Sequence, residues 1–217
     1  MTCQICEVRR PRRFCPGVRG DICAPCCGNE REVTVTCPFE CEYLQQGREH
    51  ERLPEVNPKT FPNSDIDVSE RFLREHEALL LMCASSVFGA ALETEGAVDF
   101  DVREALESLV RTYRTAQSGL IYESLPNNPI AAHVHRLVQA RLDDFRRRLA
   151  EQQGMSTIRD SELLGIFVFL QRLEIQHNNG RRRGRAFLDF LRLYFGAAPA
   201  PGPAGSPAGP SSPLLVP

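Results

Sequence analysis

Residues 1–41 read MTCQICEVRRPRRFCPGVRGDICAPCCGNEREVTVTCPFEC and hold eight of the nine cysteines of this 217-residue chain. The eight are Cys3, Cys6, Cys15, Cys23, Cys26, Cys27, Cys37 and Cys41. Two Cys-x-x-Cys pairs stand among them, and the 16 residues from 7 to 22 that separate these pairs match the spacing of a four-thiolate zinc site. The first predicted zinc site therefore consists of Cys3, Cys6, Cys23 and Cys26. The second predicted zinc site consists of Cys15, Cys27, Cys37 and Cys41.

The Cys-x-x-Cys spacing has a chemical reason. It lets two sulfurs leave one tight bend at neighbouring corners of a tetrahedron, about 2.3 Å from the metal ion. The two ligand sets alternate along the chain, so we expect a cross-braced module. Cys26 and Cys27 are adjacent and point in different directions, which favours one ligand in each site, but the reverse assignment of these two cysteines stays open. A four-sulfur site leaves no open coordination position, so we expect both zinc ions to be structural.

Two other uses of these cysteines compete with zinc. A disulfide framework needs an oxidising compartment, yet the chain runs from Met1 straight into Arg9 and Arg10 without an apolar stretch for a secretion signal. We therefore expect a cytoplasmic protein with reduced thiols. A redox-active Cys-x-x-Cys normally lies near a strand-helix-strand pattern, which this sequence lacks. The first consideration favours metal binding over a disulfide framework, and the second favours it over redox activity, but a thiol redox sensor remains a second alternative.

The cysteine-rich region resembles the treble-clef and cross-brace zinc modules. The resemblance rests on the first Cys-x-x-Cys pair, on Cys23-Ala-Pro-Cys26-Cys27-Gly28 and on Cys37-Pro-Phe-Glu-Cys41. It covers about the first quarter of the chain, and it implies a module that holds proteins or nucleic acids. The absence of histidine among the expected ligands and the three-residue gap between Cys37 and Cys41 depart from a RING-type ubiquitin-ligase pattern.

Two arginine clusters admit two interpretations. The first contains Arg9, Arg10, Arg12, Arg13 and Arg19, and the second contains Arg181, Arg182, Arg183 and Arg185. Such clusters are typical of phosphate contacts in nucleic-acid-binding proteins. Arginines between Cys6 and Cys23 can equally well balance the charge of −2 that each four-thiolate zinc centre carries. The whole chain has a formal charge of −2 before metal binds, which argues against general polyanion binding.

The rest of the chain predicts a mainly α protein. We expect a zinc module over residues 1–52, a Pro-rich linker over 53–65, an all-α bundle of about five helices over 66–195, and a disordered tail over 196–217. Capping residues and apolar periodicity place the helices near 67–96, 101–121, 129–154, 160–177 and 186–195. Residues 78–92 are very apolar but too few to span a bilayer, so we expect a core helix that contains Cys83.

The sequence favours a binding protein over an enzyme. His133 and His135 are two residues apart on a predicted helix and so face different directions, and no phosphate-binding glycine loop or nucleophile elbow is present. We expect a non-enzymatic adaptor that contacts another protein through its zinc module. A nucleic-acid-binding regulator that uses the arginines at 9–19 and 181–185 is the alternative. The oligomeric state does not follow from the sequence.

Overall fold

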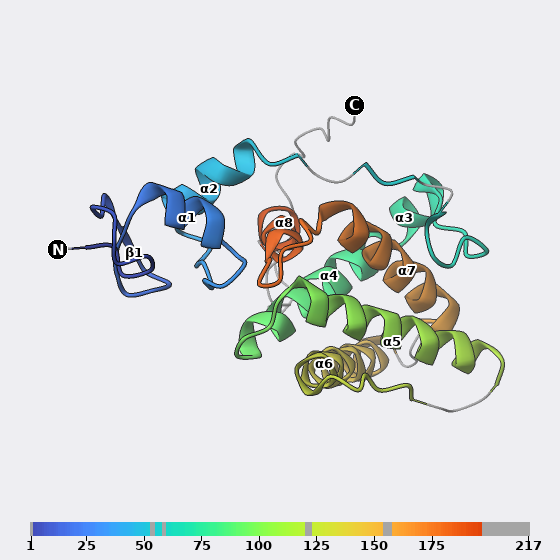
Figure 1. The fold of residues 1–217 in the computed structure, drawn as a ribbon. Coiled ribbons are helices and arrows are strands. Elements are labelled where there is room, and N and C mark those ends of the chain that lie inside the picture. Colours follow the sequence, from blue (N-terminus) through green and yellow to red (C-terminus); the bar gives the residue numbers. More distant parts are fainter. Residues whose placement is uncertain (1, 53–54, 58–59, 120–122, 154–157, 197–217) are drawn as a thin grey trace, which may run out of the picture.

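The computed structural model describes residues 2–52, 55–57, 60–119, 123–153 and 158–196. Its amino-terminal part contains β1 (Arg13–Cys15), β2 (Gly20–Ile22), α1 (Ala24–Glu30) and α2 (Glu42–Glu49). The remaining part is formed by α3 (Glu70–Glu75), α4 (Glu77–Glu93), α5 (Asp99–Gln117), α6 (Pro129–Gln153), α7 (Asp160–His177) and α8 (Ala186–Phe195). Figure 1 shows the small amino-terminal part beside the helices, with α8 facing it. The predicted mainly α fold is confirmed, whereas the predicted tail lies outside the described residues apart from Gly196.

The two short strands form an antiparallel hairpin. Phe14 pairs with Asp21, and Cys15 pairs with Gly20. Alternation along β1 points Arg13 and Cys15 toward the interior of the module, and it leaves Phe14 exposed. The hairpin therefore places Cys15 in the interior of the module and the ring of the adjacent Phe14 on its surface.

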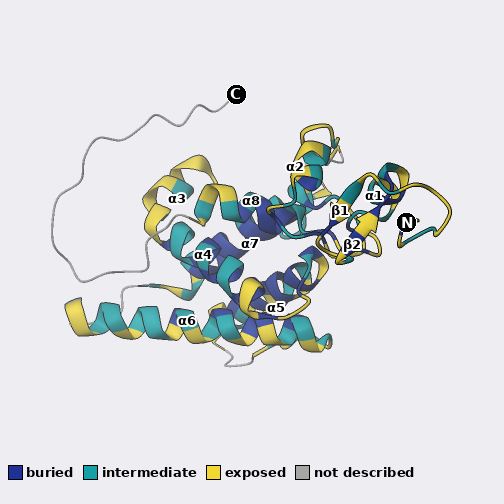
Figure 2. Cartoon of the chain, turned by 90° about the vertical axis from the view of Figure 1, so that its left-hand side faces the viewer, coloured by how far each residue is buried: buried dark blue, intermediate teal, exposed yellow. Residues whose placement is uncertain are grey.

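The main hydrophobic core lies between the long helices. Figure 2 shows buried residues concentrated on the facing sides of α4, α5, α7 and α8. Helix α7 is buried on almost every side of its central turns, as its lack of a polar face predicts. Cys83 on α4 is completely buried in this core, which confirms its expected role as a small apolar residue. None of the helices in the described ranges combines the length and apolar character needed to cross a membrane.

The first part of the bundle departs from the prediction. The chain forms two helices where the sequence predicts one, because His76 ends α3 with φ −116° and ψ 26° before α4 begins. Ser69, rather than Asp67, caps α3 by accepting the backbone N–H of Phe72, while Asp67 accepts the backbone N–H of Ser69. Six helices thus follow residue 66 in the described chain, against the five expected.

The two parts of the chain pack against each other. Phe39 lies between two cysteines in sequence, yet its side chain belongs to the core of the helical part and is 5% exposed. Its ring lies 6.5 Å from that of Phe88, and the Arg185 guanidinium stacks over it at 4.0 Å. The segment from Glu30 to Cys41 is therefore both part of the cysteine module and part of the contact with the helices.

Helix α8 receives its amino-terminal cap from a distant residue. The Asp99 carboxylate at the start of α5 accepts the backbone N–H groups of Phe187 and Leu188 at 2.9 and 3.1 Å. Asp99 also donates its own backbone N–H to Gly184. Burial raises the pKa of Asp99 to about 7, although the two N–H donors act in the opposite direction. The start of α8 is thereby tied to α5.

We predict that Asp99→Ala lowers the free energy of unfolding by about 1–3 kcal/mol near pH 5, because two buried N–H groups lose their acceptor. The loss should shrink toward pH 8. The folded pKa lies above the unfolded value of about 3.9, so the stabilising proton is fully present below the unfolded pKa and is lost as the pH rises through about 7. Urea unfolding between pH 5 and pH 8 measures both effects. Asp143→Ala, an exposed control on α6, should change little, and an equal loss in both variants contradicts the capping role.

Candidate metal centre

Local backbone structure brings the two Cys-x-x-Cys pairs together. Cys3 and Cys6 lie on a tight turn in which the Cys3 carbonyl accepts the backbone N–H of Glu7 at 2.7 Å. Glu7 itself lies in the left-handed region, with φ 55°. Cys23 precedes α1, and Cys26 lies in its first turn, where Pro25 suits the helix start. Strand β2 ends directly before Cys23, so the hairpin delivers the second pair to the first.

The four sulfurs form one compact group. All of the ligand atoms of Cys3, Cys6, Cys23 and Cys26 lie within 4.8 Å of one another. The Cys6 and Cys23 Sγ atoms are 4.0 Å apart, close to the edge of about 3.8 Å expected for a tetrahedron with 2.3 Å metal–sulfur bonds. Three of these cysteines are buried and Cys6 is half-buried. This group, the first site hereafter, can hold a metal ion with four thiolates and no open position.

The surroundings of the first site favour thiolate at some positions and thiol at others. Burial alone acts to raise the pKa of Cys3, but backbone N–H groups, including that of Cys23 at 3.3 Å from the sulfur, lower it to about 6. Backbone N–H groups of Arg9 and Val8 lower the pKa of Cys6. Hydrogen bonding to Cys23 and burial raise the pKa of Cys26 to about 12. A cation that binds all four sulfurs therefore meets two cysteines whose surroundings favour thiolate, and its binding must displace the proton of Cys26.

The structure resolves which neighbouring cysteine joins the first site. Cys26 shares the compact sulfur group with Cys3, Cys6 and Cys23, and Cys27 is not part of it. This arrangement agrees with the predicted assignment and not with its reverse. One helical step on α1 turns the adjacent side chains of Cys26 and Cys27 in different directions, which separates them.

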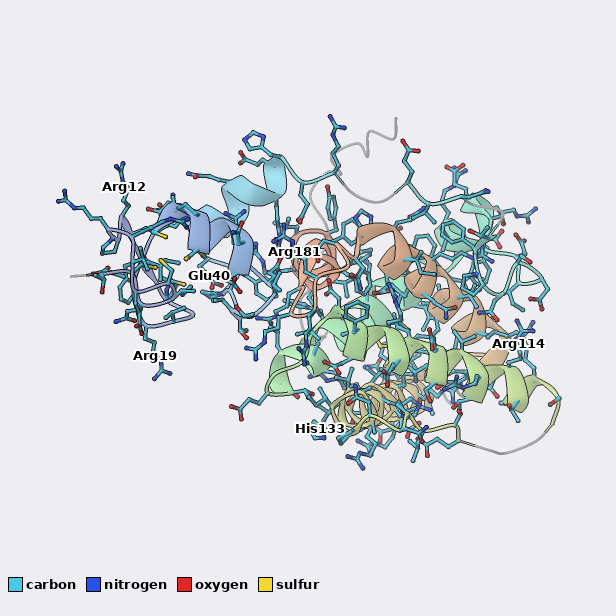
Figure 3. The ribbon with its side chains drawn as sticks, viewed as in Figure 1. Arg12, Arg19, Glu40, Arg114, His133 and Arg181 are labelled. Atoms are coloured by element: carbon cyan, nitrogen blue, oxygen red, sulfur yellow. The ribbon has the colours of Figure 1, made fainter. Side chains whose placement is uncertain are left out.

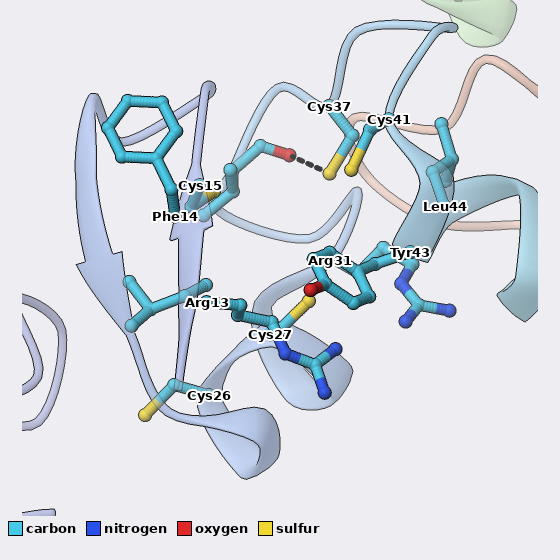
Figure 4. Close-up of a pocket in the computed structure, with 12 residues that line it drawn as sticks. Arg13, Phe14, Cys15, Cys26, Cys27, Arg31, Cys37, Cys41, Tyr43 and Leu44 are labelled. Carbon is cyan, nitrogen blue, oxygen red and sulfur yellow. Dashed lines mark hydrogen bonds between the residues drawn. The ribbon is translucent and has the colours of Figure 1, made fainter. Parts of the chain in front are cut away.

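The other predicted ligands, the second cysteine set hereafter, are less closely gathered. Cys15, Cys27, Cys37 and Cys41 all line one cavity of about 10 Å³, and Figure 4 shows them around it. Within the described ranges, only the first site brings its sulfurs within 4.8 Å of one another. The Cys37 thiol instead donates to the Val35 carbonyl at 3.8 Å, and burial raises the pKa of Cys37 to about 11.

The first arginine cluster surrounds the module on its outer side. Arg9, Arg10, Arg12 and Arg19 are exposed, while Arg13 stacks over the Tyr43 ring at 4.0 Å. In Figure 3, Arg12 and Arg19 extend from opposite sides of the module. Two apolar side chains lie among these arginines, since Val8 is 82% exposed and Phe14 is 61% exposed. The segment 8–14 therefore presents charge and apolar surface together.

The second arginine cluster largely faces the cysteine module. Arg181 donates to the Arg31 carbonyl at 2.7 Å and forms an ion pair with Glu51 at 3.1 Å. Arg183 donates its backbone N–H to the Glu32 carbonyl and its guanidinium to Thr36. Arg182 is exposed. Figure 3 places Arg181 at the junction, far from Arg12 at the outer end, so the two clusters do not form one face.

Glu32 is the central residue of this junction, and sequence reasoning missed it. Its carboxylate accepts from the Arg48 guanidinium at 2.7 Å, the Asn179 amide at 2.9 Å and the Arg185 backbone N–H at 3.0 Å. Only 1% of Glu32 is exposed, and its φ of 55° is unusual for a residue other than glycine. No local pattern marks a buried glutamate whose partners lie up to 153 residues away, whereas Phe39, a large apolar residue between two cysteines, was a visible signal.

No known family model matches the chain, and neither the curated proteins nor the solved structures contain a match. The resemblance to treble-clef and cross-brace modules therefore rests on the cysteine spacing and on the one four-cysteine group.

We predict that Cys23→Ser removes one equivalent of bound divalent metal, because a serine hydroxyl replaces one of four thiolates in the first site. Elemental analysis of the purified, reduced protein measures the metal content. Cys83→Ser is the matched control, since Cys83 lies in the helical core, and it should retain the metal content of the unaltered chain. Equal metal content in all three proteins contradicts the assignment of the first site.

Proposed function

We propose that this chain is a non-enzymatic zinc protein that works as a protein-interaction adaptor, with its amino-terminal module as the contact surface. The single observation that carries the proposal is the four-sulfur group of Cys3, Cys6, Cys23 and Cys26, which fixes the base of an exposed apolar and basic segment. A closed thiolate site is suited to holding a fold and offers no coordination position to a substrate.

Zinc is the cation that fits the donor set best. Four soft thiolates in a tetrahedral arrangement select zinc over hard cations such as magnesium or calcium, which prefer oxygen ligands. The module also has a thin apolar core, formed mainly by its cysteines together with Ile22, Val35 and Leu44. Metal binding can supply the folding free energy that such a small core lacks. A second structural zinc at the second cysteine set belongs to the same proposal.

The partner strip, defined as residues 8–14, is the surface that we assign to the adaptor role. Its chain is held between Cys6 and Cys15, and it exposes Val8 and Phe14 beside Arg9, Arg10 and Arg12. No ion pair to these three arginines is present among the described residues, so their charge is available to a partner. A protein segment that carries carboxylates and an apolar side chain complements this surface.

The charge balance favours a protein over a nucleic acid as partner. Residues 1–52 contain eight arginines and eight aspartates or glutamates, so the module is neutral apart from its histidine and thiols. Each four-thiolate zinc site would add a charge of −2. Of the second arginine cluster, Arg181 and Arg183 are engaged with the module itself. These facts support binding of a protein partner through a complementary local surface, in preference to binding of a nucleic acid through general attraction to its phosphates.

We predict that the double substitution Val8→Ser, Phe14→Ser abolishes capture of the partner in cross-linked pull-downs, because it removes the exposed apolar side chains of the strip. The metal content should stay unchanged, since neither residue is a ligand. Leu193→Ser, which alters an exposed leucine on α8, is the matched control and should retain the partner. Identical partners for all three proteins would remove the strip as the contact surface.

Nucleic-acid binding remains the second candidate, because an exposed aromatic ring beside arginines can stack on a base. The observation in its favour is the exposed ring of Phe14. Phe14 follows Arg13 in β1, and Arg12 directly precedes that strand. This function predicts an affinity for single-stranded oligonucleotides that falls steeply with salt concentration and is lost in Phe14→Ser. A flat salt response, or no binding at low salt, eliminates it.

A further inference from the structure

The second cysteine set converges from four separate places in the module. Cys15 ends β1, Cys27 lies on α1, Cys37 lies within the segment that contacts the helices, and Cys41 precedes α2. Figure 4 shows their side chains around a single cavity. Thiolates in this number and from these positions suit a soft divalent cation such as zinc, whose structural sites take four sulfurs.

Positive charge at the same cavity favours an anionic metal centre. Arg13 and Arg31 both line it, and their Nε atoms are buried with no hydrogen-bond partner among the described residues. A cation of charge +2 bound to four thiolates has a net charge of −2, with each thiol releasing its proton to solvent on binding. Two neighbouring guanidinium groups can offset this charge at short range.

Metal binding at the second set requires a local rearrangement that the first site does not need. The first site already holds its sulfurs within 4.8 Å, whereas the Cys37 thiol is directed to the Val35 carbonyl. Gathering the second set therefore means turning Cys37 and its neighbours toward the cavity. The segment that has to adjust is 35–41, and Phe39 lies in its middle.

The chain from Glu32 to Phe39 is attached to the helical part on both sides of Cys37. On one side, Glu32 accepts from Asn179 and from the backbone of Arg185, both in the loop before α8. On the other side, Phe39 lies in the helical core under the Arg185 guanidinium. The position of Cys37 and Cys41 therefore depends on whether the module is docked on α8 and on the loop that precedes it.

We propose that Cys15, Cys27, Cys37 and Cys41 form a second thiolate site for zinc, and that its occupation is coupled to docking of the cysteine module on the helical part. The coupling is reciprocal, so a docked module binds the second ion more tightly, and the second ion in turn favours docking. This inference rests on the proposed zinc-binding function, to which it adds the coupling between the second ion and docking.

Cobalt(II) titration of the metal-free, reduced full-length protein tests the proposal. Thiolate-to-cobalt absorption should rise over two equivalents, of which Cys37→Ser removes only the second. A double variant on the helical side, Asn179→Ala with Arg181→Ala, should weaken the second equivalent about tenfold, a coupling of ordinary size, and leave the first within about twofold. Arg182→Ala, a neighbouring exposed arginine, is the matched control and should change neither equivalent.

Each outcome of the titration tests a different part of the proposal. One equivalent that Cys23→Ser removes, without any second, overturns the second site and leaves the first site intact. Two equivalents whose affinities are the same in the double variant overturn the coupling alone. The absence of any thiolate–cobalt absorption overturns the proposed zinc function itself. Far-ultraviolet circular dichroism of the double variant verifies that its helices are folded, so weaker binding can be assigned to docking.

Discussion

The buried carboxylate of Glu32 is the interaction on which the arrangement of the two parts depends. An ionised carboxylate removed from water is costly unless it is paired and hydrogen-bonded, and Glu32 accepts from a guanidinium on α2 and from an amide and a backbone N–H in the loop before α8. Its left-handed backbone is a further constraint, which surrounding contacts must maintain. Removing one partner leaves a buried charge incompletely paired, so the contacts of Glu32 depend on one another.

The contacts at this junction change the interpretation of the arginines at 181–185. In the sequence they form a basic run typical of phosphate contacts, but in the folded chain Arg181 and Arg183 bind carbonyl, carboxylate and hydroxyl groups of the cysteine module. Arg185 lies over Phe39. Helix α8 is fixed from the opposite side by Asp99, so the loop before it is held between α5 and the module. Of the first arginine cluster, Arg9, Arg10, Arg12 and Arg19 remain exposed.

The elements that local chemistry determines were predictable. Cysteine spacing predicted the group of Cys3, Cys6, Cys23 and Cys26, which could hold a metal, and capping residues with apolar periodicity placed α6, α7 and α8 closely. The break at His76 was not predictable, because no proline or glycine marks it. Glu32 and Asp99 were also missed, since a buried carboxylate is recognised by partners distant in sequence. The gathering of Cys15, Cys27, Cys37 and Cys41 into one site remains a prediction.

Hydrogen–deuterium exchange on the metal-loaded and metal-stripped reduced protein tests the central claim most directly, namely that metal-dependent order in the cysteine module holds the loop before α8. Removing the metal should raise exchange in residues 30–41 and also in residues 178–189, which belong to the helical part and contain no cysteine. Exchange in the centres of α4, α5 and α7 should stay slow, because their core does not depend on the module. Unchanged exchange at 178–189, with increased exchange confined to residues 2–52, contradicts the account.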